Sequence, residues 1–300
     1  MITVRVVRTE ADIDTYVAVR TRVHPETPMP REVVVDDRKR SHHLDLLAEV
    51  DGEPAGVASV AKFGGAPDGD LAYLTIRVVA EHRRRGVGTA LHLRASEHAR
   101  TLGKTALWVT LRHLDEASLG YYGALGYREV GRMQDVSLEL AGVELEVKAP
   151  AGIRIVPATH EHDRGAYDVA LEAEPDIPAG EPLVPGSFET WLERHSGPLF
   201  ARELSFVALD GEQVVGYALL GRHTADVYEH WMTGVARDAR GRGIALALKQ
   251  AQIVAAKRAG LRALRTQNDL GNASMRRVNE KLGYELKFEW VQLTGQLLAG

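Results

Sequence analysis

The strongest constraint on this chain is an internal repeat, in which one nine-residue segment returns 157 residues later. Arg83-Arg84-Arg85-Gly86-Val87-Gly88-Thr89-Ala90-Leu91 reappears as Arg240-Gly241-Arg242-Gly243-Ile244-Ala245-Leu246-Ala247-Leu248. The same offset pairs Gly103 with Gly260, and Leu125-Gly126-Tyr127 with Leu282-Gly283-Tyr284. Matches held in one register over so long a stretch indicate a duplicated unit. A length of 300 residues also fits two domains of ordinary size.

The predicted boundary between the halves is the short segment Lys148-Ala149-Pro150-Ala151-Gly152. We therefore expect an N-terminal domain over residues 1–149 and a C-terminal domain over residues 150–300. Each half follows the order strand, helical region, antiparallel strands, glycine-bearing turn, helix, strand, helix and strand. This order predicts an α+β fold in which each domain has a mixed, mostly antiparallel sheet flanked by helices.

Composition excludes several classes of function. The chain has no cysteine, so disulfides, thiolate zinc sites and thiol nucleophiles are ruled out, and a cytoplasmic protein is indicated. Lys and Arg number 20 against 22 Asp and Glu in residues 1–150, and 17 against 19 in residues 151–300. Neither half has the basic surplus expected of a nucleic-acid binder. No apolar run is long enough to predict a membrane span, and the histidines lack the spacing of a metal site. Nothing in the sequence indicates an oligomeric state.

The repeated segment is expected to be a turn between a strand and a helix. Predicted strands over Leu71 to Val79 and His230 to Ala236 run into the arginine–glycine segments. Glycines at a helix start let backbone N–H groups approach an anion, and the helix dipole favours phosphate there. The flanking arginines add charge, so a cofactor with a pyrophosphate is the chemical expectation. Neither copy ends in the Gly-Lys-Ser/Thr of a Walker A loop, and neither has the order Gly-x-Gly-x-x-Gly.

Both turns resemble the Gln/Arg-x-x-Gly-x-Gly/Ala signature of the GNAT superfamily of acyl-CoA-dependent N-acyltransferases. The matching segments are Arg83-x-x-Gly86-x-Gly88 and Arg240-x-x-Gly243-x-Ala245. The stretch from Asn268-Asp269-Leu270-Gly271-Asn272 to Leu282-Gly283-Tyr284 is similar to a later signature of the family, an Asn-containing strand end before a closing helix. The resemblance covers both halves and is of the tandem, mycothiol-synthase-like type.

The resemblance implies an N-acetyltransferase that uses acetyl-CoA and a small-molecule amine acceptor. Two alternatives stay open: a CoA-binding sensor or scaffold with one or both halves non-catalytic, and acylation of a protein or peptide amine. The residues that the resemblance assigns to CoA are Val78, Val79, Arg83, Arg84, Arg85, Gly86, Val87, Gly88 and Thr89 in the first half, and Val235, Ala236, Arg240, Gly241, Arg242, Gly243, Ile244, Ala245, Asn268 and Asn272 in the second. It also places a carbonyl-polarising β-bulge amide near Val78-Val79-Ala80 or Val235-Ala236-Arg237.

The resemblance assigns one catalytic residue to each half. Tyr122 occupies the position of the family's general acid, whereas its counterpart in the second half is Asn279. Glu229 occupies the position of the family's general base, and the first half has Ala72 there. Tyr122 could equally be a packing aromatic, and Glu229 could be a solvated carboxylate at a strand end. One half therefore keeps the acid and the other keeps the base.

The resemblance also implies that acceptor specificity lies in the helical region between the first two strands of each half, here Val19 to Lys39 and Leu171 to Pro198. The second region carries carboxylates beside aromatic residues, which would suit a cationic amine, although acidic surface loops are common. These carboxylates are Glu172, Glu174, Asp176, Glu181 and Glu189. The sequence does not name the acceptor.

Overall fold

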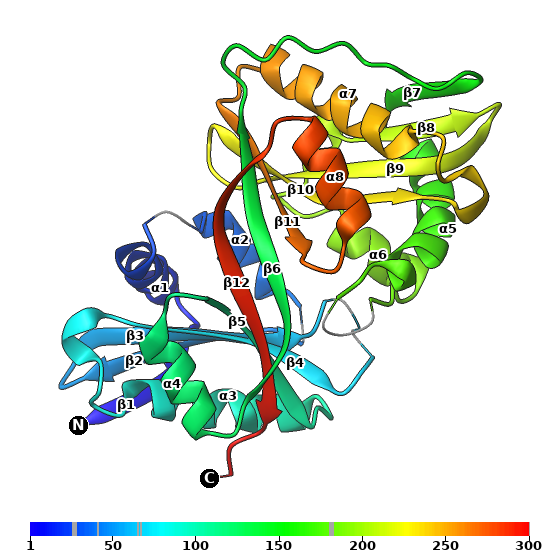
Figure 1. Ribbon diagram of the computed structural model, residues 1–300. Helices are drawn as coiled ribbons and strands as arrows, with labels where there is room; N and C mark the ends of the chain where they lie inside the picture. Colours follow the sequence, from blue (N-terminus) through cyan, green and yellow to red (C-terminus); the bar gives the residue numbers. More distant parts are fainter. Residues whose placement is uncertain (26–28, 41, 65, 67, 180–182, 300) are drawn as a thin grey trace. The chain divides into compact units, whose positions relative to one another are not determined.

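A computed structural model describes residues 1–25, 29–40, 42–64, 66, 68–179 and 183–299 (Figure 1). The chain forms two compact units: unit 1 is Met1–Val130 with Val291–Gly300, and unit 2 is Gly131–Trp290. The boundary at 149/150 follows the sequence repeat and stays a prediction. The compact units divide the chain elsewhere because strands β6 (Arg128–Glu139) and β12 (Glu285–Gln296) each begin in one unit and end in the other.

Unit 1 contains a mixed sheet with the strand order β1, β2, β3, β4, β5, followed by the end of β12. Neighbours from β1 to β4 are antiparallel, and β4 and β5 are parallel. The strands are β1 (Ile2–Val6), β2 (Leu44–Val50), β3 (Glu53–Lys62), β4 (Leu71–Val78) and β5 (Ala106–Arg112). The helices are α1 (Glu10–Val23), α2 (Arg31–Asp37), α3 (Val87–Thr101) and α4 (Glu116–Ala124), with a short 3₁₀ helix, η1 (Ala80–His82).

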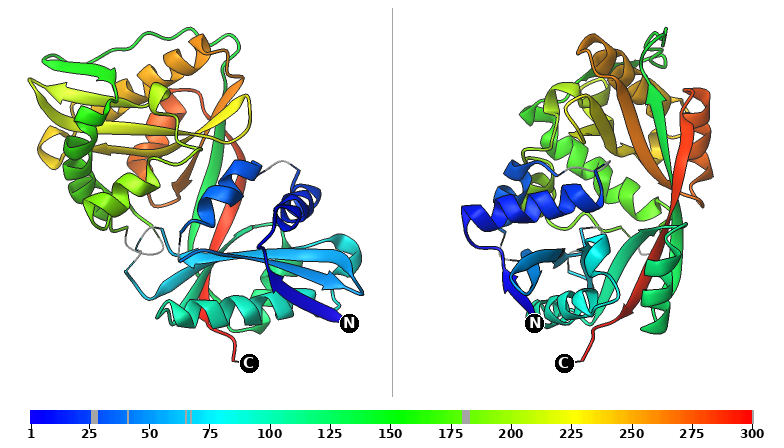
Figure 2. Two further views of the ribbon diagram at one scale, coloured as in Figure 1. Left: turned by 180° about the vertical axis from the view of Figure 1, so that it is seen from behind. Right: turned by 90° about the vertical axis from the view of Figure 1, so that its left-hand side faces the viewer.

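The alternation of side chains along β2 shows how helices cover the sheet of unit 1. Leu46 and Ala48 pack in one core cluster with Leu91 of α3, whereas Leu47 packs in another with Ile13 of α1. Successive side chains of a strand point to opposite faces, so α3 and α1 cover opposite faces of the sheet. The two views of Figure 2 agree with this placement.

Unit 2 repeats the arrangement with the strand order β6, β11, β10, β9, β8, β7. Strands β10 and β11 are parallel, and the other pairs are antiparallel. The strands are β7 (Ile153–Pro157), β8 (Phe206–Asp210), β9 (Gln213–Arg222), β10 (Val227–Val235) and β11 (Ala263–Asp269). The helices are α5 (Asp163–Ala173), α6 (Phe188–Arg194), α7 (Ile244–Arg258) and α8 (Ala273–Lys281), with the 3₁₀ helices η2 (His160–His162), η3 (Glu174–Asp176), η4 (Arg202–Leu204) and η5 (Arg237–Ala239).

The predicted fold class is confirmed, because each unit is a mixed, mostly antiparallel sheet with helices on it. The equivalent helices α3 and α7 are each followed by a glycine with positive φ, Gly103 at 73° and Gly260 at 77°. A left-handed residue after the last turn ends a helix, and glycine adopts that conformation without strain. None of the helices in the described part of the chain is long and apolar enough to cross a membrane.

Candidate functional site

In both units the parallel strand pair opens partway along its length. β10 pairs with β11 only from Val227 to His230, although β10 continues to Val235. β4 pairs with β5 only from Leu71 to Tyr73 and continues to Val78. Beyond these points the backbone groups on that edge of β10 and β4 are available to a ligand. The opening leads along each strand to the glycine turn.

Each glycine turn ends in a helix whose first residue follows a left-handed glycine. Gly86 has φ 87° before α3, and Gly243 has φ 89° before α7. A Cβ on Gly243 would meet no atom within 4 Å, so the conformation, and not crowding, requires glycine there. Neither helix has an acidic residue in its first turn. The N–H groups of that turn have no partner within the helix, so both turns suit a phosphate.

The arginines of the two turns differ in their partners. Arg240 Nη1 lies 2.8 Å from Asp176 Oδ2, and Arg242 Nη1 lies 2.9 Å from Asp210 Oδ2. In the first turn, Arg83 Nε donates to the carbonyl oxygen of Val78 at 3.1 Å and Arg85 contacts the His82 ring. No described carboxylate forms an ion pair with the arginines at positions 83–85. The first turn is therefore the more open cationic site.

A bulge is expected near Val235-Ala236-Arg237, but the irregularity of this strand lies several residues earlier. The register of β10 against β9 shifts between His230 and Met232, at Trp231. A Cβ on Gly221 would lie 2.0 Å from Trp231 Cε2, so glycine on the neighbouring strand makes room for the indole. The alternative position near Val78-Val79-Ala80 has no bulge in the paired part of the strand: β4 pairs with β3 without a shift from Ala72 to Val78, and the Val79 N–H donates to the Ala55 carbonyl oxygen at 3.1 Å. The resemblance implied only an approximate position, and a sequence does not show at which residue a strand bulges.

Glu229 lies on β10 next to the point where the parallel strands separate. Its partner in the register is Arg265 of β11, whose Nε is 3.8 Å from Glu229 Oε1. No hydrogen bond to the Glu229 carboxylate is found among the described residues. Burial raises the pKa of Glu229; the charge of Arg265 opposes this rise and that of Asp135 adds to it. A carboxylate of this kind suits a general base.

The sequence analysis missed Arg265 and Asp135. Both side chains are almost completely buried, and Arg265 Nη2 donates to Asp135 Oδ2. Asp135 lies on β6, which pairs with β11 in antiparallel register. The available signal was a charged residue in the middle of each strand, since buried charges are rare unless they are paired.

The two candidate acid positions have different chemistry. Tyr122 of α4 is 4% exposed, and its ring packs against His92, Tyr121 and Tyr127. Burial raises the pKa of Tyr122 well above its ordinary value, so the hydroxyl keeps its proton at neutral pH. Asn279 of α8 is 3% exposed, and neither its Nδ2 nor its Oδ1 has a hydrogen-bond partner among the described residues.

A buried polar cluster lies beside α7. His230 Nδ1 donates to Gln252 Oε1 at 2.7 Å, which leaves Nε2 to accept from the Tyr284 hydroxyl. Lys249 Nζ lies 5.4 Å from the centre of the Tyr284 ring, and burial lowers the pKa of Lys249 to about 7. The sequence position of Lys249 corresponds to His92, which bonds Tyr121 and Tyr127 in unit 1. Both units thus bury a polar side chain of this helix against tyrosines.

Of the two asparagines assigned to CoA, Asn272 has a structural task. Its Oδ1 accepts from the backbone N–H of Met275 at 3.1 Å and so caps α8. Asn268 is buried on β11.

Three of the described acidic residues in the region 171–198 already have partners within the protein, while Glu189 is exposed. Glu174 is 1% exposed and accepts two hydrogen bonds, from the Tyr217 hydroxyl at 3.1 Å and from Trp191 Nε1 at 3.4 Å. Glu172 accepts a hydrogen bond from the backbone N–H of Arg237 at 3.0 Å, and Asp176 forms ion pairs with Arg237 of η5 and with Arg240 of the second turn. Glu181 lies outside the described residues.

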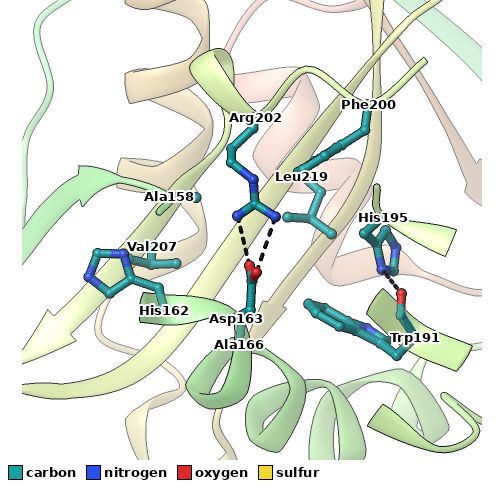
Figure 3. A pocket seen from close by; sticks show the side chains of 10 residues that line it. All are labelled: Ala158, His162, Asp163, Ala166, Trp191, His195, Phe200, Arg202, Val207 and Leu219. Carbon is teal, nitrogen blue, oxygen red and sulfur yellow. Dashed lines mark hydrogen bonds and ion pairs between the residues drawn. The ribbon is translucent and has the colours of Figure 1, made fainter. Parts of the chain in front are cut away.

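A small cavity in unit 2 is lined by α5, α6, β8 and β9 (Figure 3). Asp163 and Arg202 form a two-bonded ion pair in it, and His195 Nδ1 donates to the carbonyl oxygen of Trp191 at 2.8 Å. Its volume of about 10 Å³ holds about one water molecule. The cavity is too small for an amine acceptor.

Comparison with known proteins agrees with this geometry. The model of the Acetyltransferase (GNAT) family matches residues 12–127 and 167–284. The mycothiol acetyltransferase of Actinosynnema mirum is 28% identical over 249 residues, covering 80% of this chain and 79% of that protein. Two solved structures share the fold. A GCN5-related N-acetyltransferase from Sphaerobacter thermophilus is 22% identical, with a TM-score of 0.76 over 100% of this chain and 96% of that one. A tandem GNAT protein from the clavulanic acid biosynthesis pathway is 19% identical, with a TM-score of 0.78 over 100% of both chains. The duplicated glycine turns, the opened strand pairs and these matches together show that the chain belongs to the GNAT acetyltransferase family and contains two tandem GNAT domains.

Proposed function

We propose that the chain is an N-acetyltransferase that moves an acetyl group from acetyl-CoA to a small-molecule amine by direct attack, with the reaction in unit 2. The observation that carries the proposal is the position of Glu229, a carboxylate without a hydrogen bond at the point where β10 and β11 separate. The opened edge of β10 runs from Glu229 toward the turn before α7, so the proposed base and the proposed anion site follow one another along the same segment of chain.

The residues of the second turn fit the pyrophosphate of CoA. Gly243 gives the chain its left-handed turn, the first turn of α7 has no carboxylate, and Arg240 and Arg242 flank it. When bound, acetyl-CoA supplies a thioester carbonyl carbon that an amine can attack while the carbon–sulfur bond breaks. The protein's task is to hold that carbon near Glu229 and to remove a proton from the acceptor.

Proton removal is the step that this site supports best. A primary amine is largely protonated at neutral pH and cannot attack until a base, directly or through water, takes its proton. The raised pKa of Glu229 brings this carboxylate closer to the working pH of such a base. Asn279 can donate a hydrogen bond but cannot serve as an ordinary acid, so the departing thiolate takes its proton from water.

The first half favours the second candidate function, CoA binding without turnover. The position of Glu229 is taken there by Ala72, which is completely buried, so the base is missing. The arginines of its turn are not paired with carboxylates among the described residues, which favours anion binding. Unit 1 would then be a CoA-binding sensor or scaffold, and unit 2 the reacting unit.

Turnover with a panel of acceptors tests the proposal. We expect release of free CoA thiol with at least one of polyamines, aminoglycosides or amino-acid amides, and none with peptides. The chain has no cysteine, so a thiol reagent reports CoA without background from the protein. Similarity to a mycothiol acetyltransferase supports a small-molecule acceptor. We also propose that the protein acts in the cytoplasm, because it has no cysteine. Activity only with peptides would favour a protein N-acetyltransferase, and CoA binding without any turnover would favour the sensor.

A further inference from the structure

Three charged side chains form a line across neighbouring strands of unit 2. Glu229 of β10 is in register with Arg265 of β11, and Asp135 of β6 pairs with Gln267 two residues further along β11. Residues two apart on a strand point to the same face, so all three side chains lie on one face of the sheet. The inference drawn from this line rests on the proposed role of Glu229 as a base.

Arg265 stands between the two carboxylates but binds them unequally. Its Nη2 donates to Asp135 Oδ2, its Nη1 donates to His223 Nε2 at 2.7 Å, and its Nε faces Glu229 Oε1 at 3.8 Å without a hydrogen bond. The Arg265 side chain is 9% exposed, so water does not replace these contacts. The guanidinium thus forms hydrogen bonds with Asp135 and His223, and lies near Glu229 without a hydrogen bond to it.

Asp135 is fixed by further donors. Gln267 Nε2 lies 3.3 Å and Trp290 Nε1 3.5 Å from the oxygen that accepts from Arg265. The Asp135 side chain is 3% exposed. An ionised carboxylate with three donors on one oxygen is held in a single orientation.

We propose that Asp135 is a positioning residue for Glu229, because it holds the Arg265 guanidinium back from a closed ion pair with the base. A bidentate ion pair with Arg265 would stabilise the ionised form of Glu229 and make it a weaker base. At 3.8 Å and without a hydrogen bond, Arg265 orients the carboxylate electrostatically and leaves both oxygens open to an acceptor proton.

The charges around Glu229 support this assignment. The charged groups that act on its carboxyl are Arg265 from β11 and Asp135 from β6. On β9 the residue in register is Gly221, and the titratable neighbours on β10 itself are Tyr228 and His230. The removal of either Asp135 or Arg265 should therefore move the titration of Glu229, in opposite directions.

The arrangement belongs to the second site alone. At the repeat offset, Glu229, Arg265 and Asp135 correspond to Ala72, Trp108 and Gln292. Asp135 precedes the predicted boundary at residue 149 but packs within unit 2. The N-terminal half of the sequence thus supplies the residue that positions the base of the C-terminal half.

Titration of Glu229 in the full-length protein tests the proposal without knowledge of the acceptor. Side-chain carboxyl ¹³C signals of glutamate are followed against pH, and Glu229→Gln identifies the signal that belongs to Glu229. We expect Asp135→Asn to lower the pKa of Glu229 by at least about 0.5 unit, Arg265→Gln to raise it, and Asp135→Glu to restore most of the original value. Asp163→Asn is the matched control, because it breaks another ion pair of unit 2, the partly buried one with Arg202, and should leave the titration unchanged.

Three outcomes would overturn the proposal: an Asp135→Asn shift below about 0.2 unit, shifts of the same sign in the two single variants, or an equal shift in the control. If Asp135→Asn does not fold, Asp135→Ser takes its place and should lower the pKa of Glu229 for the same reason, because it also removes the negative charge. An unchanged pKa of Glu229 in that variant overturns the proposal. Failure of the proposed function looks different, since Glu229→Gln would then keep full activity even where the titration shifts as expected. Once an acceptor is known, the apparent pKa on the acid side of the pH profile of kcat/KM should shift in the same direction as the pKa of Glu229.

Discussion

Arg240 Nη1 lies 2.8 Å from Asp176 Oδ2, so a cation expected to bind pyrophosphate is already paired with a carboxylate. Arg237 of η5 binds the same carboxylate through two bonds of 2.8 Å. These arginines hold the pKa of Asp176 far below its usual range. A ligand phosphate must therefore compete with Asp176 for the second turn.

We expect Asp176→Asn to tighten CoA binding at the second turn by about 3- to 10-fold, because a charged competitor for Arg240 becomes neutral. Calorimetry in a Gly86→Glu background measures the second turn alone. Asp168→Asn, which breaks the exposed pair with Arg164 in the same unit, should leave the affinity unchanged. Weaker binding in Asp176→Asn would show that Asp176 positions the arginines for CoA.

Gly86→Glu and Gly243→Glu should each remove one CoA site from the wild-type protein. The new side chain brings a negative charge to the anion site and requires φ near 87° or 89°, which costs about 1–2 kcal/mol in a residue with a Cβ. Calorimetric stoichiometry should fall from two to one in each variant. Gly243→Ala carries the strain without the charge and should keep part of the binding. A folded wild-type protein that binds no CoA would contradict the proposed function.

Glu229→Gln should lower kcat/KM by about 10²- to 10⁴-fold near neutral pH, with partial recovery at high pH. The free amine becomes populated at high pH and no longer needs the base. Gly86→Glu should leave most of the activity intact, because it acts on the other unit. Glu212→Gln, at a 95% exposed side chain, is the control for loss of a carboxylate. A flat response of Glu229→Gln across pH, with activity lost in Gly86→Glu, would assign the reaction to unit 1.

Tyr122→Phe separates the proposed acid from a packing aromatic. Phenylalanine keeps the ring contacts with His92, Tyr121 and Tyr127 and removes only the hydroxyl. With the reaction in unit 2, we expect kcat to stay within about 2-fold and CoA affinity to be unchanged. A fall of about 10- to 10⁴-fold in kcat at unchanged CoA affinity would make Tyr122 the general acid of a working first half.

Lys249 should make the free energy of unfolding depend on pH. Its pKa falls from 10.5 to about 7 in the folded chain because of burial, so the unfolded chain binds more protons between these values. The free energy of unfolding should therefore rise by about 1.4 kcal/mol per pH unit between pH 7 and pH 10. The reason is that Lys249 must lose its proton on folding, and this loss costs less as the pH rises. Lys249→Met should lack this rise and be more stable at neutral pH. Urea unfolding at several pH values measures the free energy of unfolding of both proteins. The same dependence on pH in the wild type and in Lys249→Met would contradict the prediction.

The sequence by itself determined the duplication, the order of elements and the position of the two glycine turns. These features are local: Gly86 and Gly243 both have positive φ, a conformation that glycine adopts without strain. The fold class followed from the same order and is confirmed in both units.

Only the tertiary structure decided which side chains act together. Asp135 and Arg265 are 130 residues apart and meet because β6 pairs with β11 in one register. The bulge at Trp231 depends on Gly221 of the neighbouring strand, and the pairing of Asp176 with Arg240 joins residues 64 apart. Periodicity tells which face a side chain takes, but a shift of one residue in register would place Arg265 on the other face. Strand register and packing therefore decide which residues lie next to Glu229. Neither can be read from a single segment of the sequence, because both depend on strands that are far apart in it.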